Sequence, residues 1–228
     1  MAKIFSTDDP GVVRLHFSDT TTAFDGVKRA VLKGKGINCC KICSTLFQVL
    51  EENGVPTYFI REDGPRDLLC RSTEEVPLKL TIRHRVMGST SRILGLEEGT
   101  PLKNSLYELR YLKESLCFPL VNDHHVVALG LMSYGELGYI HEIARKVDSV
   151  LTDLFAKAGI ELVDAKLMFG KTADGEWVIS DEITPDNCRL WDIETGERLD
   201  KDRFRLDMSD VCAKYQEVKD RLLKQLEK

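Results

Sequence analysis

The stretch from residue 162 to residue 192 constrains the fold more than any other part of this 228-residue chain. Apolar and polar side chains alternate over residues 163–169, and this period of two is typical of a strand with one face buried. Asp174-Gly175 follows as a strong hairpin turn signal. A second run, residues 176–183, is rich in Trp, Val and Ile. The sequence therefore predicts an antiparallel hairpin here.

Charged side chains would gather on one surface of that hairpin. Asp164 and Lys166 lie on the polar side of the first run, and Asp181 comes near the end of the second. Turn residues after the second run then deliver Arg189 and Trp191. Carboxylate, ammonium and guanidinium groups together are what a magnesium–nucleotide or phosphate site requires. An ordinary solvated sheet face carries the same alternation, so the pattern alone fits both interpretations.

Composition limits the class of protein. Hydrophobic residues make up 43% of the chain, which is enough for a sizeable core in one large domain or two lobes. The net charge is −5 with both signs interspersed, which argues against a general grip on nucleic acid. No apolar run approaches the roughly 18 residues of a membrane span, and the first residues lack the apolar core of a signal peptide. We therefore expect a cytoplasmic protein that binds neither nucleic acid nor membrane.

The seven cysteines predict no zinc site. Cys39, Cys40 and Cys43 cluster, but they fall in a stretch with helical apolar spacing. A zinc site would need a second pair of ligands at suitable spacing, which the five histidines do not offer. We expect buried thiols in a reducing compartment.

Periodicity and turn residues predict most of the remaining elements. The expected strands are residues 3–7, 12–17, 57–62, 68–71 and 76–87, and the expected helices are 38–52, 134–158 and 209–226. Residues 106–120 fit either a strand or a helix, whereas 121–125 and 196–208 are expected to be loops. Gly34-Lys35-Gly36 could cradle a phosphate, but it matches no Walker pattern, so a plain flexible loop is the simpler interpretation.

Two further segments carry side chains suited to phosphate or proton chemistry. Arg83 and Arg85 leave a strand and enter the turn at residues 88–91, which contains Ser89. The arginine fork and the serine hydroxyl suit a phosphate monoester, although a charged strand edge would look similar. The pair His124-His125 is either a metal or acid/base element or a hydrogen-bonded loop.

An ordered set of motifs resembles the phosphoribosylaminoimidazole-succinocarboxamide synthases, or SAICAR synthetases, of purine biosynthesis. The matching segments are Phe24-Asp25-Gly26, Gly34-Lys35-Gly36, Arg83 to Ser89, Leu94 to Gly99, Val163 to Leu167, Asp181 to Asp186, Arg189 to Asp192 and Asp200 to Arg205. The resemblance implies an α+β, two-lobed fold with an ATP-grasp-like nucleotide cleft. We expect residues 1–76 to form an N-terminal α+β lobe, and residues 77–228 a larger lobe with a central antiparallel sheet and a C-terminal helix.

The resemblance also implies an activity. An ATP-dependent amide ligase of this family joins L-aspartate to carboxyaminoimidazole ribonucleotide through an acyl phosphate. ATP and Mg²⁺ are the implied cofactors, and small molecules are the implied partners. Helices with apolar faces often pair, so a homo-oligomer is among the expected states.

Site residues follow from the matched motifs. Those implied to bind the ribonucleotide are Arg83, Ser89, Asp186, Arg189 and Arg205. Those implied to act in catalysis are Lys166, Asp181 and Asp25; Lys166, Asp181 and Lys3 would serve ATP, with Asp181 on the metal.

Three departures from the family pattern fall on this site. Only Lys3 lies near the position of the family's Gly-Lys-x-Lys loop, which covers the ATP phosphates. Met168 stands where the family has a magnesium-binding glutamate, and a thioether is a poor ligand for so hard an ion. Leu112 and Phe118 replace a lysine and an aspartate. The alternatives to the synthase are therefore a relative using another amine or another imidazole or pyrazole ribonucleotide, and a catalytically silent nucleotide-binding protein.

Overall fold

The computed structural model describes residues 2–24 and 26–227. Its first sheet has the strand order β1-β2-β6-β5 and is antiparallel throughout. The strands are β1 (Lys3–Ser6), β2 (Val12–His16), β5 (Phe59–Glu62) and β6 (Asp67–Arg71). A separate two-stranded sheet joins β3 (Thr20–Ala23) to β4 (Lys28–Val31). The strands expected from the sequence in this part of the chain are confirmed.

The second sheet contains the hairpin predicted first. Its order is β11-β10-β7-β8-β9, and β12 also pairs with β10. The strands are β7 (Thr73–Arg85), β8 (Pro101–Tyr111), β9 (Leu120–Val121), β10 (Ile160–Thr172), β11 (Trp177–Ile179) and β12 (Cys188–Asp192). Strands β10 and β11 are antiparallel, with Phe169 opposite Ile179. Strand β10 therefore lies at the centre and carries neighbours on both edges.

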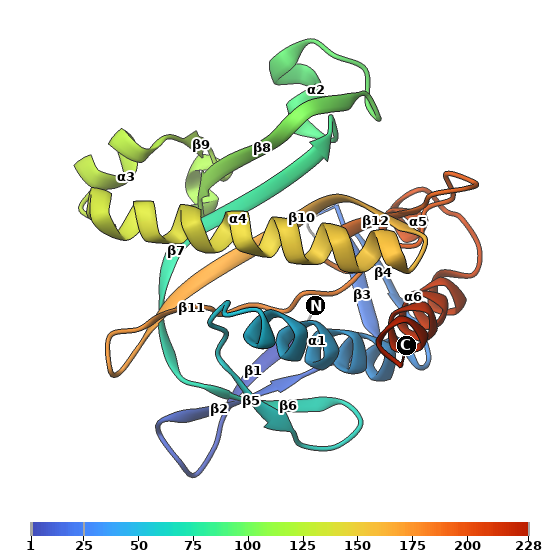
Figure 1. Cartoon of the computed structure of the whole chain (residues 1–228), viewed down its shortest axis with the longest axis horizontal. Coiled ribbons are helices and arrows are strands. Elements are labelled where there is room, and N and C mark those ends of the chain that lie inside the picture. The colour runs from blue at the N-terminus through green and yellow to red at the C-terminus, as the bar shows by residue number, and fades with distance from the viewer. Residues whose placement is uncertain (1, 25, 228) are drawn as a thin grey trace.

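Helix α1 (Lys35–Glu52) packs against the first sheet and α4 (Tyr134–Lys157) against the second, and the other helices are shorter or lie at the ends of the sheets (Figure 1). These others are α2 (Ser89–Leu94), α3 (Asp123–Ala128), α5 (Asp202–Arg205) and α6 (Val211–Leu226), with one 3-10 turn at Glu114–Leu116. Figure 1 shows α4 lying across β7 and β10, and the first sheet on the other side of α1. Helix α4 buries the apolar stripe that its sequence predicts, including Ile140, Ala144 and Leu151. No helix of the described residues is long and apolar enough to cross a membrane.

One hydrophobic core runs through both parts of the chain. Buried residues of α1, α4 and α6 belong to the same cluster as those of the two large sheets. The strands of the first sheet end at Arg71, and those of the second begin at Thr73. The division into lobes near residue 76 stays a prediction.

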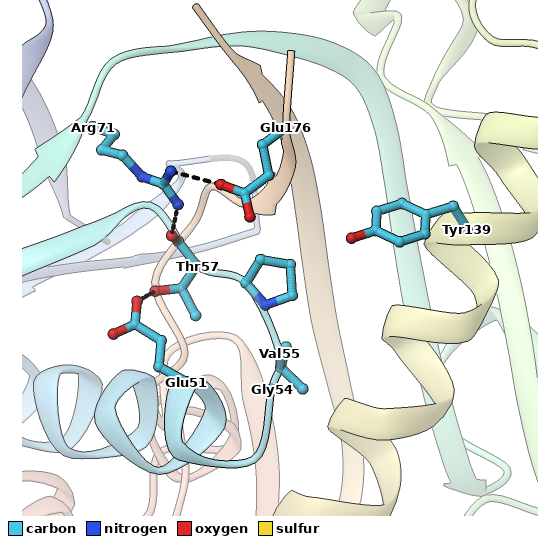
Figure 2. Close-up of a pocket in the computed structure, with 8 residues that line it drawn as sticks. Glu51, Gly54, Val55, Thr57, Arg71, Tyr139 and Glu176 are labelled. Atoms are coloured by element: carbon cyan, nitrogen blue, oxygen red, sulfur yellow. Dashed lines mark hydrogen bonds and ion pairs between the residues drawn. The ribbon is translucent and has the colours of Figure 1, made fainter. Parts of the chain in front are cut away.

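An ion pair also connects the two sheets at the surface. Arg71, at the end of β6, donates to the backbone oxygen of Thr57 at 2.7 Å and to the Glu176 carboxylate at 2.7 Å. Figure 2 shows these contacts beside Tyr139 of α4, around a hollow where the end of α1 meets the β10–β11 hairpin. Arg71 therefore fixes the hairpin relative to the first sheet.

Two segments expected to be loops are helical. Residues 123–128 form α3, because Asn122 and His125 make a reciprocal capping box. The charged segment 196–208 contains the short helix α5, and its residues Asp200 to Phe204 are buried. Both errors have one cause: side-chain partners, and not apolar periodicity, determine these structures.

The glycine-lysine segment is not a flexible loop, and the ambiguous segment is mainly extended. Lys35 and Gly36 open α1, and Lys35 is buried. A Cβ on Gly36 would lie 2.1 Å from the backbone oxygen of Phe17, so only glycine fits this close approach. Residues 106–120 comprise the end of β8, the 3-10 turn and the start of β9.

Candidate functional site

Polar side chains cross the face of the second sheet that lies opposite α4. Strand register places them in rows. One row holds Arg189, Asp164 and Arg83; the next holds Lys166, Thr81 and Glu108; the third holds Met168, Lys79 and Arg110. The alternate residues of the same strands, such as Ala165, Leu167 and Leu80, are buried in the core. We call the residues of these three rows the polar face.

Arginine and carboxylate groups form a continuous network at one end of the polar face. Arg83 donates through Nε to Glu108 at 2.8 Å and through Nη1 to Asp164 at 2.7 Å. Arg189 donates through Nη1 to the same oxygen of Asp164 at 2.5 Å. Asp164 therefore holds two guanidinium groups side by side.

The network continues into the segment after β12. Arg189 donates through Nε to Asp202 at 2.6 Å, and Asp202 is also paired with Arg205. Burial would lower the pKa of Arg189, but its pairs with Asp164 and Asp202 raise it strongly. Arg83 and Arg189 each keep an Nη2 group that bonds to no residue the structure describes. The predicted phosphate-binding arginines are thus held in fixed orientations with donors to spare.

Ser89 joins this face through an arginine that the sequence reasoning did not single out. Arg110 donates through Nη2 to Ser89 Oγ at 2.7 Å and through Nη1 to the backbone oxygen of Phe118 at 3.0 Å. Ser89 therefore lies next to the end of the third row.

Lys166 is a half-buried cation in the middle of the polar face. Burial lowers its pKa to about 8; Asp164 opposes this effect, and Arg189 adds to it. Its ammonium group makes no hydrogen bond or ion pair with a described residue. The Lys166 ammonium group is therefore not fully neutralised by nearby negative charge, and a bound anion would stabilise its charged form.

Asp181 lies at the other end, just after β11. Burial raises its pKa to about 7, and neighbouring Glu182 adds to the rise. The Glu182 carboxylate is already engaged, since it accepts from the backbone nitrogen of Ala2 at 2.8 Å and from Thr184 Oγ1 at 2.9 Å. A buried carboxylate with a raised pKa favours either a proton or a bound cation.

Metal ligands are sparse at this end. The described residues contain no group of three His, Cys, Asp or Glu side chains arranged to hold a metal ion. Met168 lies on the polar face, half-buried, where the family pattern has a carboxylate. A magnesium ion at Asp181 would therefore need most of its oxygen ligands from a phosphate or water.

Two other predicted site residues, Asp186 and Lys3, lie outside this arrangement. Asp186 is buried in an ion pair with Lys35, at 2.5 Å. Lys3 is exposed at the start of the edge strand β1. Asp25 lies outside the described residues. The roles assigned to these three residues stay predictions.

Lys79, Glu108 and Arg110 are polar-face residues that the sequence analysis gave no role. The alternation over residues 78–83 already places Lys79 on the same side as Arg83, and this signal could have identified it. Glu108 and Arg110 fall in the segment that fitted either a strand or a helix, so no pattern placed them.

Two expected features lie apart from catalysis in this structure. In the histidine pair, His125 caps α3 and His124 bonds to the hydroxyl of Tyr134 at 2.6 Å. The clustered thiols are buried in α1, as expected: Cys39, Cys40 and Cys43. Burial raises the pKa of Cys40 to about 12, so this thiol is unreactive.

The fold and the polar face together define an α+β protein with a cationic, hydrogen-bonding surface on one sheet face. Comparison with known proteins agrees. Residues 1–222 match the family model described as SAICAR synthetase, and the chain belongs to that family. The expected family, fold and enzyme class, a carboxylate–amine ligase, are confirmed.

Individual relatives match over nearly their whole length. The phosphoribosylaminoimidazole-succinocarboxamide synthase of Clostridium perfringens is 44% identical over 220 residues, covering 96% of this chain and 93% of the relative. SAICAR synthetase from Pyrococcus horikoshii superposes with a TM-score of 0.93 at 41% identity, covering 98% of each chain. A SAICAR synthetase solved in complex with ADP also has a TM-score of 0.93 at 41% identity, covering 97% of this chain and 94% of that one.

Proposed function

We propose that this chain uses ATP to join L-aspartate to carboxyaminoimidazole ribonucleotide through an acyl phosphate. The observation that carries this proposal is the charge arrangement of the polar face. Lys166 is a half-buried cation with no described partner, and it lies one row from the paired guanidinium groups of Arg83 and Arg189. The face can therefore hold a polyphosphate and a second, phosphorylated substrate close together.

The chemistry explains why both ligands must be held together. A carboxylate is a poor acyl donor, because its leaving group would be oxide. If a carboxylate oxygen of the ribonucleotide attacks the terminal phosphorus of ATP, ADP leaves and an acyl phosphate forms. The aspartate amine then attacks the acyl carbon, phosphate leaves with that oxygen, and the nitrogen loses a proton. Positioning and charge neutralisation are what the protein must supply.

Individual residues suit these roles. With a pKa of about 8, Lys166 is largely protonated at neutral pH and can stabilise the transferring phosphoryl group. Arg83, Arg189 and Arg205 would hold the ribonucleotide phosphate and neighbouring carboxylate through their remaining N–H groups, with Ser89 as a further donor.

Magnesium would bind at Asp181. Its oxygen suits a hard cation, and a bound cation would relieve the unfavourable charge that the raised pKa of this carboxyl indicates. The ion would supply charge neutralisation of the ATP phosphates.

We propose the remaining roles on the family resemblance alone. Asp186 would contact the ribonucleotide, Lys3 would lie near ATP, and Asp25 would lie near the reacting groups. We also propose a cytoplasmic location, a homo-oligomer and a lobe boundary near residue 76. A ligase for another amine or ribonucleotide, or a silent nucleotide-binding protein, is less well supported, because relatives 44% identical bear the synthase name.

Coupled ADP release tests the proposal. The assay contains magnesium, ATP, carboxyaminoimidazole ribonucleotide and aspartate, and each component is omitted in turn. We expect turnover only when all four are present. Ribonucleotide binding without any turnover would contradict the proposal and support the silent-protein alternative.

A further inference from the structure

Lys79 and Met168 are direct cross-strand partners in the third row of the polar face. Register places Lys79 of β7 opposite Met168 of β10. Both are half-buried. The Lys79 ammonium group makes no hydrogen bond or ion pair within residues 2–24 and 26–227. A half-buried ammonium group without a partner needs an explanation, because most such groups are paired.

The rest of this row offers no negative charge to Lys79. On its other side lies Arg110, and beyond Met168 lies Ser180, whose backbone nitrogen donates to the Met168 oxygen at 3.1 Å. Ser180 Oγ is buried and has no hydrogen-bond partner among the described residues. The row therefore presents an unpaired ammonium, a guanidinium and an unsatisfied hydroxyl, all of which suit an anion.

Lys79 also acts on the two residues proposed to serve ATP. It is a positive neighbour of both Asp181 and Lys166. An anion bound beside Lys166 and Asp181 would therefore lie within the electrostatic reach of Lys79. A polyphosphate is the anion that the proposed function places there.

Met168 reduces the number of oxygen ligands available to a metal ion at this end of the polar face. A thioether is a poor ligand for magnesium, so Met168 removes one oxygen ligand from this end of the polar face. The Glu182 carboxylate is engaged by Ala2 and Thr184. Oδ1 of Asp181 accepts from the backbone nitrogen of Glu182 at 2.8 Å. With few free carboxylate oxygens, a metal ion is held weakly, and part of the phosphate charge must be balanced in another way. A fixed ammonium group opposite Met168 supplies that balance.

We propose that Lys79 binds the nucleotide polyphosphate directly and replaces part of the charge neutralisation that magnesium would provide. The inference rests on the proposed nucleotide-binding function. It has a direct consequence: this chain should bind ADP nearly as well without magnesium as with it, and the metal-free binding should depend on Lys79.

Calorimetric titration with ADP, in excess magnesium or in EDTA, tests the inference. For the unmodified protein we expect the two dissociation constants to agree within about fivefold, or roughly 1 kcal/mol. Lys79→Gln should weaken binding in EDTA by about tenfold or more, equal to about 1.4 kcal/mol. Lys103→Gln is the matched control: it changes an exposed lysine of β8 and should leave both constants unchanged. Thermal melts of each variant confirm that the fold is retained.

Met168→Glu provides a second, independent variant. The new carboxylate would lie within reach of Lys79, since directly paired residues have Cβ atoms about 4.5–5.5 Å apart. It should neutralise Lys79 and add a magnesium ligand, so binding should weaken in EDTA and gain more from magnesium than in the unmodified protein.

The outcomes separate this inference from the proposed function. Unchanged ADP affinity of Lys79→Gln in EDTA, or a loss of more than about a hundredfold when magnesium is removed from the unmodified protein, overturns the role of Lys79 alone. An unmodified protein that binds ADP under neither condition overturns the nucleotide-binding function and, with it, this inference.

Discussion

The Nζ atom of Lys35 lies 2.5 Å from Oδ2 of Asp186, and the two side chains are only 2% and 0% exposed. This ion pair joins the start of α1 to the turn between β11 and β12. Tyr215 of α6 donates to the other carboxylate oxygen at 3.0 Å. Burial would raise the pKa of Asp186, but Lys35 holds it well below its usual range. Asp186 therefore fixes three elements to one another.

Lys35→Met should destabilise the protein severely. It leaves the Asp186 charge buried without its main partner, and removing one partner of a buried pair typically costs about 3–5 kcal/mol. Urea unfolding monitored by circular dichroism measures the change. The double variant Lys35→Met with Asp186→Asn should recover part of the loss, because it removes the uncompensated charge. A loss below about 1 kcal/mol in the single variant would show that the pair contributes little.

Arg83→Lys should lower the free energy of unfolding by about 2–4 kcal/mol and reduce ribonucleotide affinity. Arg83 serves Glu108 and Asp164 with two directed donors, which one ammonium group cannot reproduce. The matched control is Arg85→Lys, two residues along the same strand. Arg85 pairs with Glu161 near the surface, so this change should cost less than about 1 kcal/mol. Equal losses in the two variants would contradict the account.

His84 should make stability depend on pH. Its Nδ1 lies 2.5 Å from the backbone oxygen of Leu162, and its Nε2 lies 2.7 Å from Asp148. Both partners are acceptors, so the doubly protonated ring satisfies both contacts. The bond to Asp148 is the largest cause of a raised pKa, burial opposes it, and Glu161 adds to it.

A raised pKa in the folded state has a defined sign. The stabilisation is fully present below the unfolded value, about 6.5, and is lost as the pH rises through the folded value. Urea unfolding between pH 6 and pH 9 should therefore show falling stability, and His84→Gln should reduce this slope. His124→Gln, at an exposed histidine of α3, is the control and should keep it. An unchanged slope in His84→Gln would refute the assignment.

Asp181→Asn should stabilise the unliganded protein while removing activity. A pKa raised to about 7 means that the charged carboxylate is unfavourable in the folded state at higher pH. At pH 8 the neutral amide should raise the free energy of unfolding by about 1–3 kcal/mol. Thermal melts of the unliganded protein, and with ADP in magnesium or in EDTA, provide the measurement, and the small contribution of magnesium to the stabilisation by ADP should disappear. The backbone nitrogen of Glu182 donates to Oδ1 of Asp181 at 2.8 Å, and an amide oxygen can accept the same bond, so a less stable variant would contradict this prediction.

Regular periodicity made much of the fold predictable. The β10–β11 hairpin, α4 and α6 each repeat an apolar pattern over many residues, so local sequence and tertiary burial agree. The errors occurred where burial depends on a distant charge. Lys35 opens a helix in the interior because Asp186, 151 residues away, neutralises it, and no local pattern carries that information.

Site residues could be placed from the sequence where they lie on strands with clear alternation. Asp164 and Arg83 lie on strands with clear alternation, and the structure brings them together. Arg110 could not be placed, because its segment fitted two kinds of element. Alternation placed Lys79 on the correct face of its strand, but its proposed role in binding phosphate depends on the register that sets it opposite Met168.

Transfer of oxygen from substrate to phosphate is the most direct test of the account, because the polar face is proposed to hold both substrates for acyl phosphate chemistry. Carboxyaminoimidazole ribonucleotide labelled with ¹⁸O in its carboxylate is turned over with ATP and aspartate, and the released phosphate is analysed by mass spectrometry. The account predicts one labelled oxygen in each phosphate, taken from the carboxylate that attacked ATP. Turnover that releases unlabelled phosphate would contradict it.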